Sequence, residues 1–461
     1  METGTFENLR VELPVKLIEL VDVQLEERLG EHGTARIVGI LAEGEEKNAM
    51  DKLTMKVNAK ILLKGRGEQK IVFSGVPTKV SIAHAGNTYH IEVTIQSYSI
   101  LMDLKRKSKS FQNKSQTYTQ IFQYIVSIYG GEVKDLISNG KTQNNPHIQW
   151  KETDWEFLKR MASHFGAYIY PLIEADKPKI FVGISKTASH TINETVYEVK
   201  KNLSEYWWRK ENDIPISEKN DTAYEVETTE HYELGDQAVF QGRTFIIARK
   251  WSGMKQGRLV HVYELVPEEG LKTRKRYQEE FSGASVEGKI IAREKDKLKL
   301  HLSIDEMQEE AEAYWYSFST SYTAEGATGW YAMPETGQSV QLFFPDRDET
   351  KAYITKGIRK DGENNPKTQD VSTKYFGTKE GKEMVLSPSG ITFHVLQNET
   401  TVQLSNHGGV TISSPKPIQM NAGETLSCDC KNFSVTSKDK IALSTKGATI
   451  VVDNITHIIG S

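Results

Sequence analysis

Residues 408–453, "GGVTISSPKPIQMNAGETLSCDCKNFSVTSKDKIALSTKGATIVVD", repeat a short apolar motif that limits how this part of the chain can fold. The motif recurs at intervals of 8, 8, 7, 8 and 8 residues. The first positions of the repeats, each predicted to begin a short strand, are Val410, Ile418, Leu426, Phe433, Ile441 and Thr449. The positions two residues further on keep this spacing and are predicted to face one core: Ile412, Met420, Cys428, Val435, Leu443 and Val451.

A repeat this short cannot bury its apolar face alone. Each unit offers only two or three inward side chains, too little apolar area to offset the entropy of ordering it, so the units must stack. A solenoid closed by one chain usually needs about 20 or more residues per turn. Several chains wound round one axis would solve the problem. Three chains, each giving one strand per level, would form a rigid β-prism, although the period alone does not fix their number.

The two cysteines of the chain, Cys428 and Cys430, stand one residue apart, a spacing that suggests a metal clip or a redox pair. The repeat offers a simpler explanation. Cys428 is in register with apolar residues and acts as a small hydrophobe. Cys430 takes the next position on the same side, where other units place Ser414, Ala422, Ser437 and Thr445. Metal binding or oxidation at several copies of Cys430 near an axis stays open.

The whole chain has 461 residues and a mass of 52.1 kDa, which predicts three or four folded units. The net charge of −4, from 58 basic and 62 acidic residues, gives no general attraction to nucleic acid or anionic lipid. The N-terminus lacks a basic segment followed by an apolar run, and no stretch approaches the roughly 18 apolar residues of a membrane span. We therefore expect a modular protein made in the cytoplasm.

The first part of the chain alternates apolar and polar residues between glycine-containing turns, which predicts a first β-barrel over residues 1–110. It ends in a basic stretch that contains Lys105, Arg106, Lys107 and Lys109. This stretch can be interpreted as a contact for a polyanion, or as a solvated turn or subunit contact.

Residues 111–170 change to a helical period. Thr117 and Gln120 can form a capping box, with Ile121, Ile125 and Ile128 on one face. Thr153 and Glu156 can form a second box before a helix that Gly166 ends. The apolar face of this second helix, the hub motif, consists of Trp155, Leu158, Met161 and Phe165.

Two further β units follow. Residues 171–275 predict a second barrel. Residues 281–360 predict a small barrel of the oligonucleotide/oligosaccharide-binding (OB) type, with Leu298, Leu300, Leu302 and Ile304 on one face. Within it, "GWYAMPETGQSVQLFFP" predicts two strands around the turn Pro334–Gly337.

Three stretches now carry a family resemblance: "LMDLKRKSKSFQNKS", "QTYTQIFQYIVSIYG" and "IQWKETDWEFLKRMASHFGAYIY". They resemble successive signatures of VgrG, the spike of type VI secretion, and of its relatives in contractile phage tails. "GWYAMPETGQSVQLFFPDRDETKAYITKGI" is similar to that family's small barrel, and residues 376–461 resemble its needle. The strict Val-Gly rhythm of the family is missing, which blurs the subfamily.

The resemblance implies a mainly β protein: two hub barrels with inserted helices, an OB-fold neck and an intertwined trimeric β-helix. It implies a homotrimer that meets a hexameric tube protein and a baseplate, bears a PAAR-like tip protein and carries effectors. It also implies that the particle assembles in the cytoplasm and that firing drives the spike through a target envelope, which it contacts only transiently. No nucleic acid, cofactor or enzymatic activity is expected.

The remaining chemical candidates are few. No nucleophile elbow, zinc-protease helix or phosphate loop is present in the sequence. One acidic group could hold a cation or form a solvated loop: Asp346, Asp348 and Glu349. A second acidic group lies at the start of a helix, where the helix dipole favours negative charge: Glu152, Asp154 and Glu156. At the tip, the residues predicted to receive a cap are His457, Ile458 and Ile459. His457 is predicted to be an ordinary polar residue of the tip, with a metal-ligand role as the alternative. The alternative function is a trimeric phage-type tail spike that binds or cleaves a surface glycan.

Overall fold

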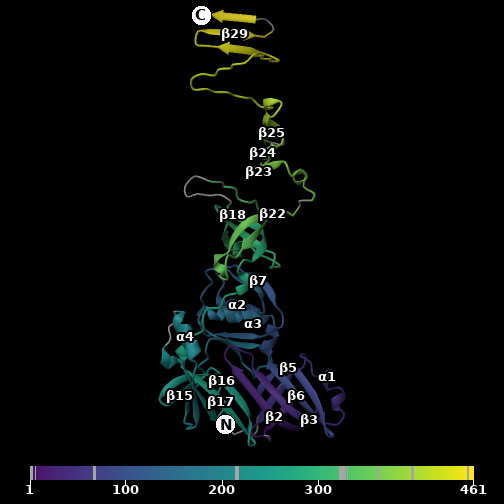
Figure 1. The fold of residues 1–461 in the computed structure, drawn as a ribbon, viewed down its shortest axis with the longest axis vertical. Helices are drawn as coiled ribbons and strands as arrows, with labels where there is room; N and C mark the ends of the chain where they lie inside the picture. The colour runs from purple at the N-terminus through teal and green to yellow at the C-terminus, as the bar shows by residue number, and fades with distance from the viewer. Residues whose placement is uncertain are drawn as a thin grey trace. The chain divides into compact units, whose positions relative to one another are not determined.

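The computed structural model describes residues 4–5, 7–65, 69–212, 217–320, 329, 331–360, 363–395 and 399–453, and the backbone of 456–460. The chain divides into two compact units, Met1–Lys360 and Asp361–Ser461. Both are built mainly from β-strands, as the sequence predicts (Figure 1). Over the described part of the chain, no helix has the length and apolarity needed to cross a membrane.

Unit 1 contains a sheet of 12 strands in the order β1-β4-β5-β6-β3-β2-β16-β17-β14-β13, with β15 on β16 and β12 on β15. The strands from the first part of the chain are β1 (Leu9–Glu12), β2 (Leu17–Arg28), β3 (Thr34–Leu41), β4 (Ala59–Lys64), β5 (Gln69–Ala85) and β6 (Thr88–Ser97). Those from the second part are β12 (Ser189–Ile192), β13 (Tyr197–Lys201), β14 (Thr222–Thr228), β15 (Gln237–Phe240), β16 (Arg243–Lys255) and β17 (Arg258–Val266). Two short helices, α1 (Ala49–Lys52) and α4 (Leu203–Glu211), lie in the connections.

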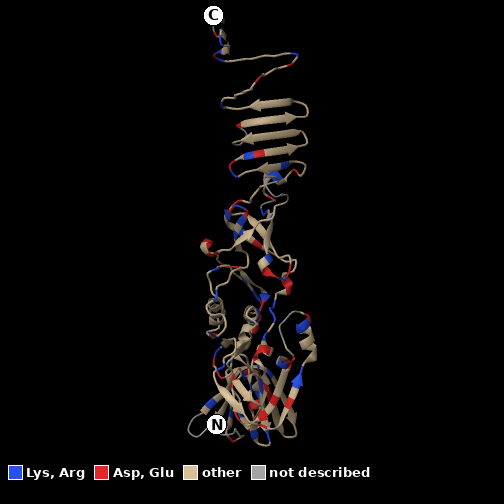
Figure 2. Cartoon of the chain, turned by 90° about the vertical axis from the view of Figure 1, so that its left-hand side faces the viewer, with Lys and Arg blue, Asp and Glu red and all other residues tan. Residues whose placement is uncertain are grey.

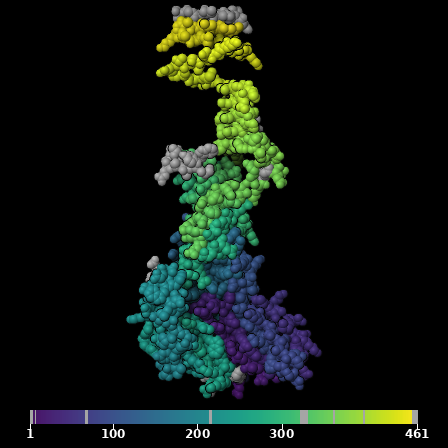
Figure 3. Space-filling view, in the orientation of Figure 1, coloured from purple at the N-terminus to yellow at the C-terminus, as the bar shows by residue number. Residues whose placement is uncertain are grey.

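The expectation of two closed barrels needs a correction. Over the described residues the strand order is an open path, and the two predicted barrel segments share one sheet because β2 pairs antiparallel with β16. Figure 3 shows the purple and teal segments packed side by side in unit 1. Without this pairing, β2 and β16 would each leave one edge without backbone hydrogen bonds. Two separate apolar cores remain, one against β2–β6 and one against β14–β17.

The helical segment forms as predicted, with one exception. Thr117 and Thr153 each close a capping box, at the start of α2 (Tyr118–Ser127) and of α3 (Asp154–Ser163). Ile121 and Ile125 of α2 are buried. The prediction for Ile128 is wrong: it is 54% exposed, because α2 ends at Ser127 and Ile128 is the residue that follows.

The hub motif lies in a buried cluster between the two helices. Trp155, Leu158 and Met161 are buried, and Phe165, just beyond α3, is half-buried against the same cluster. The strands around these helices are β7 (Lys107–Phe111), β8 (Glu132–Asp135), β9 (His147–Glu152), β10 (Ile169–Pro171) and β11 (Lys179–Val182).

The predicted neck is a five-stranded sheet in the order β20-β19-β18-β21-β22. Its strands are β18 (Ser285–Glu294), β19 (Lys297–Leu302), β20 (Trp315–Ser317), β21 (Ser339–Phe343) and β22 (Tyr353–Ile358). Leu298, Leu300 and Leu302 are buried as predicted, and Ile304 packs against them half-buried. Of the two strands predicted around Pro334–Gly337, β21 forms, whereas the described residues of the other, 329 and 331–333, belong to no strand. Both edges of β21 are already occupied, by β18 and β22.

Unit 2 consists of two antiparallel meanders. The first is β23 (Lys374–Gly377), β24 (Lys382–Ser387), β25 (Gly390–Val395), β26 (Thr400–Ser405) and β27 (Gly409–Ser413). The second is β28 (Ile441–Ser444), β29 (Ala448–Val452) and β30 (Thr456–Gly460). Of the six predicted repeat strands, those at Val410, Ile441 and Thr449 form, whereas residues 414–440 contain no strand. The strands predicted at Ile418, Leu426 and Phe433 need backbone partners from other chains, so they stay a prediction.

Candidate functional site: an uncovered sheet face and two buried charged clusters

The β23–β27 sheet has one strongly apolar face. Residues opposite each other on paired antiparallel strands point to the same face. One row of such partners crosses all five strands: Phe376, Met384, Phe393, Val402 and Ile412. A neighbouring row crosses all five strands, with Lys374 at its β23 end and four apolar residues on the other strands: Leu386, Ile391, Leu404 and Val410. We call the nine apolar residues of these two rows the apolar face.

The opposite face of the same sheet is mainly polar. One of its rows is Tyr375, Val385, Thr392, Gln403 and Thr411, and the other is Gly377, Glu383, His394, Thr401 and Ser413. Glu383 and His394 are 3.2 Å apart on it. Figure 2 shows that few residues of these strands are charged. The sheet is therefore amphipathic.

Within the described part of the chain, much of the apolar face is exposed to solvent. Phe376 is 52% exposed, Phe393 47% and Ile412 55%. Large contiguous apolar patches are rare on monomeric soluble proteins and mark sites of association. This face is the principal candidate surface for assembly.

The six predicted core residues do not share one face within the chain. Ile412 belongs to the apolar face, while Met420, Cys428 and Val435 lie exposed in residues 414–440. Leu443 stands opposite Ile450, whereas Val451 stands opposite Ala442. Paired residues share a face, and adjacent residues of one strand point to opposite faces. Leu443 therefore shares a face with Ile450, and Val451 points to the other face. The prediction that Leu443 and Val451 share a face is corrected for this hairpin.

The predicted tip lies at the end of the second meander. His457, Ile458 and Ile459 belong by backbone to β30, paired with β29. Their side chains lie outside the described residues.

The basic stretch after β6 is largely engaged inside unit 1. Lys107 Nζ lies 2.5 Å from Asp154 Oδ2 and 3.1 Å from the Tyr129 hydroxyl. Arg106 lies 3.4 Å from Glu280, and Lys109 donates to Tyr124. These contacts favour the interpretation as a structural turn over a polyanion site.

A first charged cluster, the junction cluster, joins α3 to the neck. Arg160 is buried and pairs with both oxygens of Glu152 at 2.9 Å. Its remaining amino group donates at 2.9 Å to Glu349, which also contacts His147 Nδ1 at 2.8 Å. Tyr118 then connects His147 to His164. The guanidinium group of Arg160 thus joins three segments: α3, β9 and the loop that contains Glu349.

The protonation of the junction cluster follows from its pairing. Burial by itself would raise the pKa of Glu349, but Arg160 and His147 outweigh it and lower that pKa to about 2. Burial and the neighbouring His147 lower the pKa of His164 to about 3. Glu349 is therefore an ionised buried group and His164 a neutral one at pH 7.

The junction cluster changes the interpretation of two predicted carboxylate groups. Asp346 pairs with Lys351, and Asp348 accepts a hydrogen bond from the Thr350 amide, as expected of a solvated loop. Glu349, predicted with them, is buried instead. At the start of α3, Glu152 and Asp154 bind cationic side chains in addition to any dipole effect.

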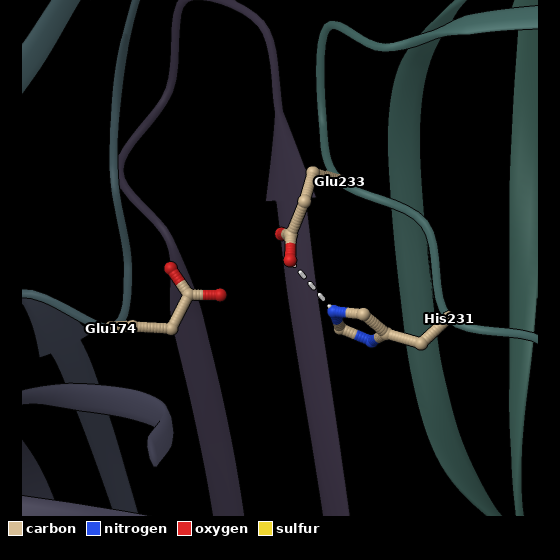
Figure 4. Close-up of side chains that lie close together, drawn as sticks. All are labelled: Glu174, His231 and Glu233. Carbon is tan, nitrogen blue, oxygen red and sulfur yellow. Dashed lines mark hydrogen bonds and ion pairs between the residues drawn. The ribbon is translucent and has the colours of Figure 1, made fainter. Parts of the chain in front are cut away.

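A second charged cluster, the carboxylate–histidine cluster, consists of Glu174, His231 and Glu233 (Figure 4). One ligand atom from each lies within 4.8 Å of the others. His231 and Glu233 occupy the β14–β15 connection, and Glu174 the β10–β11 connection. His231 Nε2 lies 2.9 Å from Glu233 Oε1.

The surroundings of this cluster leave one carboxylate without compensation. Lys250 pairs with Glu27 at 3.0 Å and lies 4.0 Å from Glu233. Both oxygens of Glu174 are buried and have no hydrogen-bond partner among the described residues. Burial, with Glu27 and Glu233 nearby, raises the pKa of Glu174 to about 7. Burial also lowers the pKa of His231, which keeps its ring neutral.

Neither charged cluster could be predicted from a local pattern in the sequence. Arg160 and Glu349 are 189 positions apart, and Glu174 is far from His231 in the chain. The only local signal is "HYE", which places a histidine and a glutamate two positions apart and therefore on one side of an extended segment.

Comparisons with known proteins agree with this architecture. Residues 26–192 match the family model described as phage tail baseplate hub (GPD). No curated protein matches the chain by sequence.

Two solved structures have a similar fold. The E. coli c3393 protein, described as a component of the type VI secretion system with structural similarity to T4 tail proteins gp27 and gp5, is 13% identical with a TM-score of 0.53. The match covers 76% of this chain and 99% of that one. A chain of the Francisella PdpA–VgrG complex in its half-lidded form is 9% identical with a TM-score of 0.53, and the match covers 88% of each chain. The fold predicted from the sequence is therefore confirmed, and residues 26–192 are similar to the phage tail baseplate hub family.

Proposed function

We propose that this chain is the hub and spike of a contractile injection apparatus, and that it works as a homotrimer. In this role unit 1 mounts on the tube end and baseplate, and unit 2 supplies the needle that is driven into a target envelope. The role is mechanical rather than enzymatic. The match to the baseplate hub family supports the proposal that unit 1 mounts on the baseplate. The apolar face is the main observation that supports the proposal of a needle in unit 2.

The apolar face argues for partners that are copies of the same chain. An isolated sheet with one uncovered apolar face is unstable in water until another layer covers it. Three identical sheets can turn their apolar faces to a common axis and leave their polar faces in solvent. The same winding would give backbone partners to residues 414–440, which lack them in one chain.

The proposal extends to what the needle carries. A separate tip protein of the PAAR type would cap the end around His457, Ile458 and Ile459, and effectors would travel as separate chains. The particle would assemble in the cytoplasm and leave the cell on contraction. These partners follow from the family resemblance.

The solution mass of the full chain tests the assembly. We expect three times the chain mass of 52.1 kDa by light scattering after size-exclusion chromatography. Replacing Phe393 with Asp would put an unpaired charge on the buried face and should abolish the trimer. Thr392→Asp, on the polar face of the same strand, is the matched control and should assemble normally.

A monomeric wild-type protein would overturn the trimer proposal. Equal loss of assembly in both variants would show that the strand, and not its apolar face, is sensitive. A glycan-binding tail spike, the alternative, would also be trimeric, but its sheet would wind in broad coils. Electron microscopy separates a thin needle from such a broad β-helix.

A further inference from the structure

We propose that Glu174, His231 and Glu233 form a binding site for a divalent first-row transition metal ion, of which zinc is the first to test. The site belongs to unit 1, whereas the residue for which the sequence raised a metal question, His457, belongs to unit 2. It does not depend on the spike function proposed above.

The donor set suits such an ion. An imidazole nitrogen with carboxylate oxygens is a common ligand combination for zinc and its neighbours in the first transition row. A metal-binding imidazole must be neutral, and His231 Nε2 is the ring nitrogen that lies beside the other two donors. This nitrogen faces the Glu233 carboxylate and could exchange this hydrogen bond for a bond to the metal if the ring proton moves to Nδ1.

The spacing also suits the ion. Three atoms that all lie within 4.8 Å of one another share a point no farther than about 2.8 Å from each. Zinc binds nitrogen and carboxylate oxygen at about 2.0–2.2 Å, so side-chain movements of less than roughly 1 Å would complete the contacts. Figure 4 shows Glu174 and Glu233 with their carboxyl groups turned toward the same space as the His231 ring.

Glu174 provides the independent reason to expect a ligand. Its two oxygens are buried without a partner among the described residues, and an unpaired buried carboxylate destabilises the fold. The nearest cation in the interior, Lys250, is already paired with Glu27. Lys70, which lies 3.5 Å from both His231 and Glu233, is 43% exposed and can swing into solvent when an ion enters. A metal would supply the missing positive charge.

The site would tie together two distant parts of the hub. Glu174 follows Ile173, which is buried in the core against β2–β6, whereas His231 and Glu233 precede β15. An ion held by all three would fasten the β14–β15 connection onto the β10–β11 connection. The expected consequence is a more heat-resistant hub, because ligands that bind only the folded state stabilise it.

The test uses the full chain, freed of metal by a chelator and titrated with zinc chloride in a calorimeter. We expect one high-affinity ion per chain and a rise in the thermal midpoint of tryptophan fluorescence. All seven tryptophans lie in residues 150–330, so this signal reports on unit 1. Glu174→Gln should abolish the high-affinity zinc binding. Loss of a residue that only hydrogen-bonds to a metal ligand would lower the affinity by roughly 10- to 100-fold, so a larger loss identifies Glu174 as a ligand. Its fold should persist without metal, because Glu174 holds no hydrogen bond that the change would break.

Two further variants separate this site from other donors. His190→Gln alters a histidine that pairs with Asp236 at 2.8 Å outside the cluster and should bind zinc normally. The double variant Cys428→Ser, Cys430→Ser should also bind normally, and cobalt(II) bound to the wild type should lack a thiolate charge-transfer band. His231→Gln serves as a second test if Glu174→Gln fails to fold. Zinc binding that survives Glu174→Gln and His231→Gln, or the absence of high-affinity binding by the wild type, would overturn the proposal.

Discussion

The two units of this protein use the same kind of side chain in opposite ways. In unit 1, apolar residues at strand and helix periods lie in four buried clusters within one chain. In unit 2, equally regular apolar rows remain on the surface of a single sheet. This difference shows that the period of the apolar residues predicts which face will be buried, but not which chain will cover it.

The largest effect is expected at the junction cluster of unit 1. Arg160→Met should lower the free energy of unfolding by about 3–5 kcal/mol, because it leaves Glu152 and Glu349 buried without their cation. Urea unfolding followed by tryptophan fluorescence measures it. Lys351→Ala, which removes a surface ion pair with Asp346, should leave the urea midpoint close to that of the wild type. Equal effects would mean that the junction cluster is not a tightly coupled unit.

The same substitution in both units tests the comparison directly. Ile125→Ala empties a buried position of α2 and should reduce the stability of unit 1 by about 2–5 kcal/mol. Ile412→Ala removes an exposed side chain of the apolar face, so the tryptophan transition should not move, whereas the trimer proposed above should dissociate at a higher protein concentration than that of the wild type. A shift of unit 1 stability by Ile412→Ala would contradict the division into independent units.

Acid should weaken unit 1 through the junction cluster. His164 has its pKa lowered to about 3, so between about pH 6.5 and 3 the unfolded chain binds a proton that the folded chain refuses. Its contribution to stability is therefore lost as the pH falls through that range, by a few kcal/mol at most. Glu349, with a pKa lowered to about 2, adds a further loss below about pH 4.5.

A variant isolates the histidine contribution. His164→Gln should flatten the dependence of the urea midpoint on pH between about 6.5 and 4.5, where Glu349 contributes little. If wild type and variant keep the same slope in that range, His164 is not held neutral as inferred.

The smallest effect concerns a local feature that the sequence predicted correctly. Thr117→Ala removes the side chain that accepts from the Gln120 amide and should cost about 1 kcal/mol. Thr117→Ser keeps the cap and should be close to wild type in the same urea experiment. An unaffected Thr117→Ala protein would show that packing of α2 alone fixes its start.

Local features could be predicted, and their errors were local too. Both capping boxes, the buried row of β19 and most of the hub motif formed as expected, because caps and side-chain periods depend on residues a few positions apart. Ile128 was predicted on the apolar face of α2, but α2 ends at Ser127 and Ile128 is exposed. The described residues of the second strand predicted around Pro334–Gly337 belong to no strand, and both edges of β21 are occupied by β18 and β22.

The mainly β class, the caps of α2 and α3 and the apolar period of the C-terminal part follow from the amino-acid sequence alone. Only the tertiary structure decided that β2 and β16 join two segments into one sheet, that the apolar face of β23–β27 is a continuous surface, and that Leu443 and Val451 part to opposite faces. It alone brought Glu349 to Arg160 and Glu174 to His231. The physical reason is that these contacts join residues far apart in the chain, and strand pairing and charge burial between distant segments leave no periodic trace in either segment.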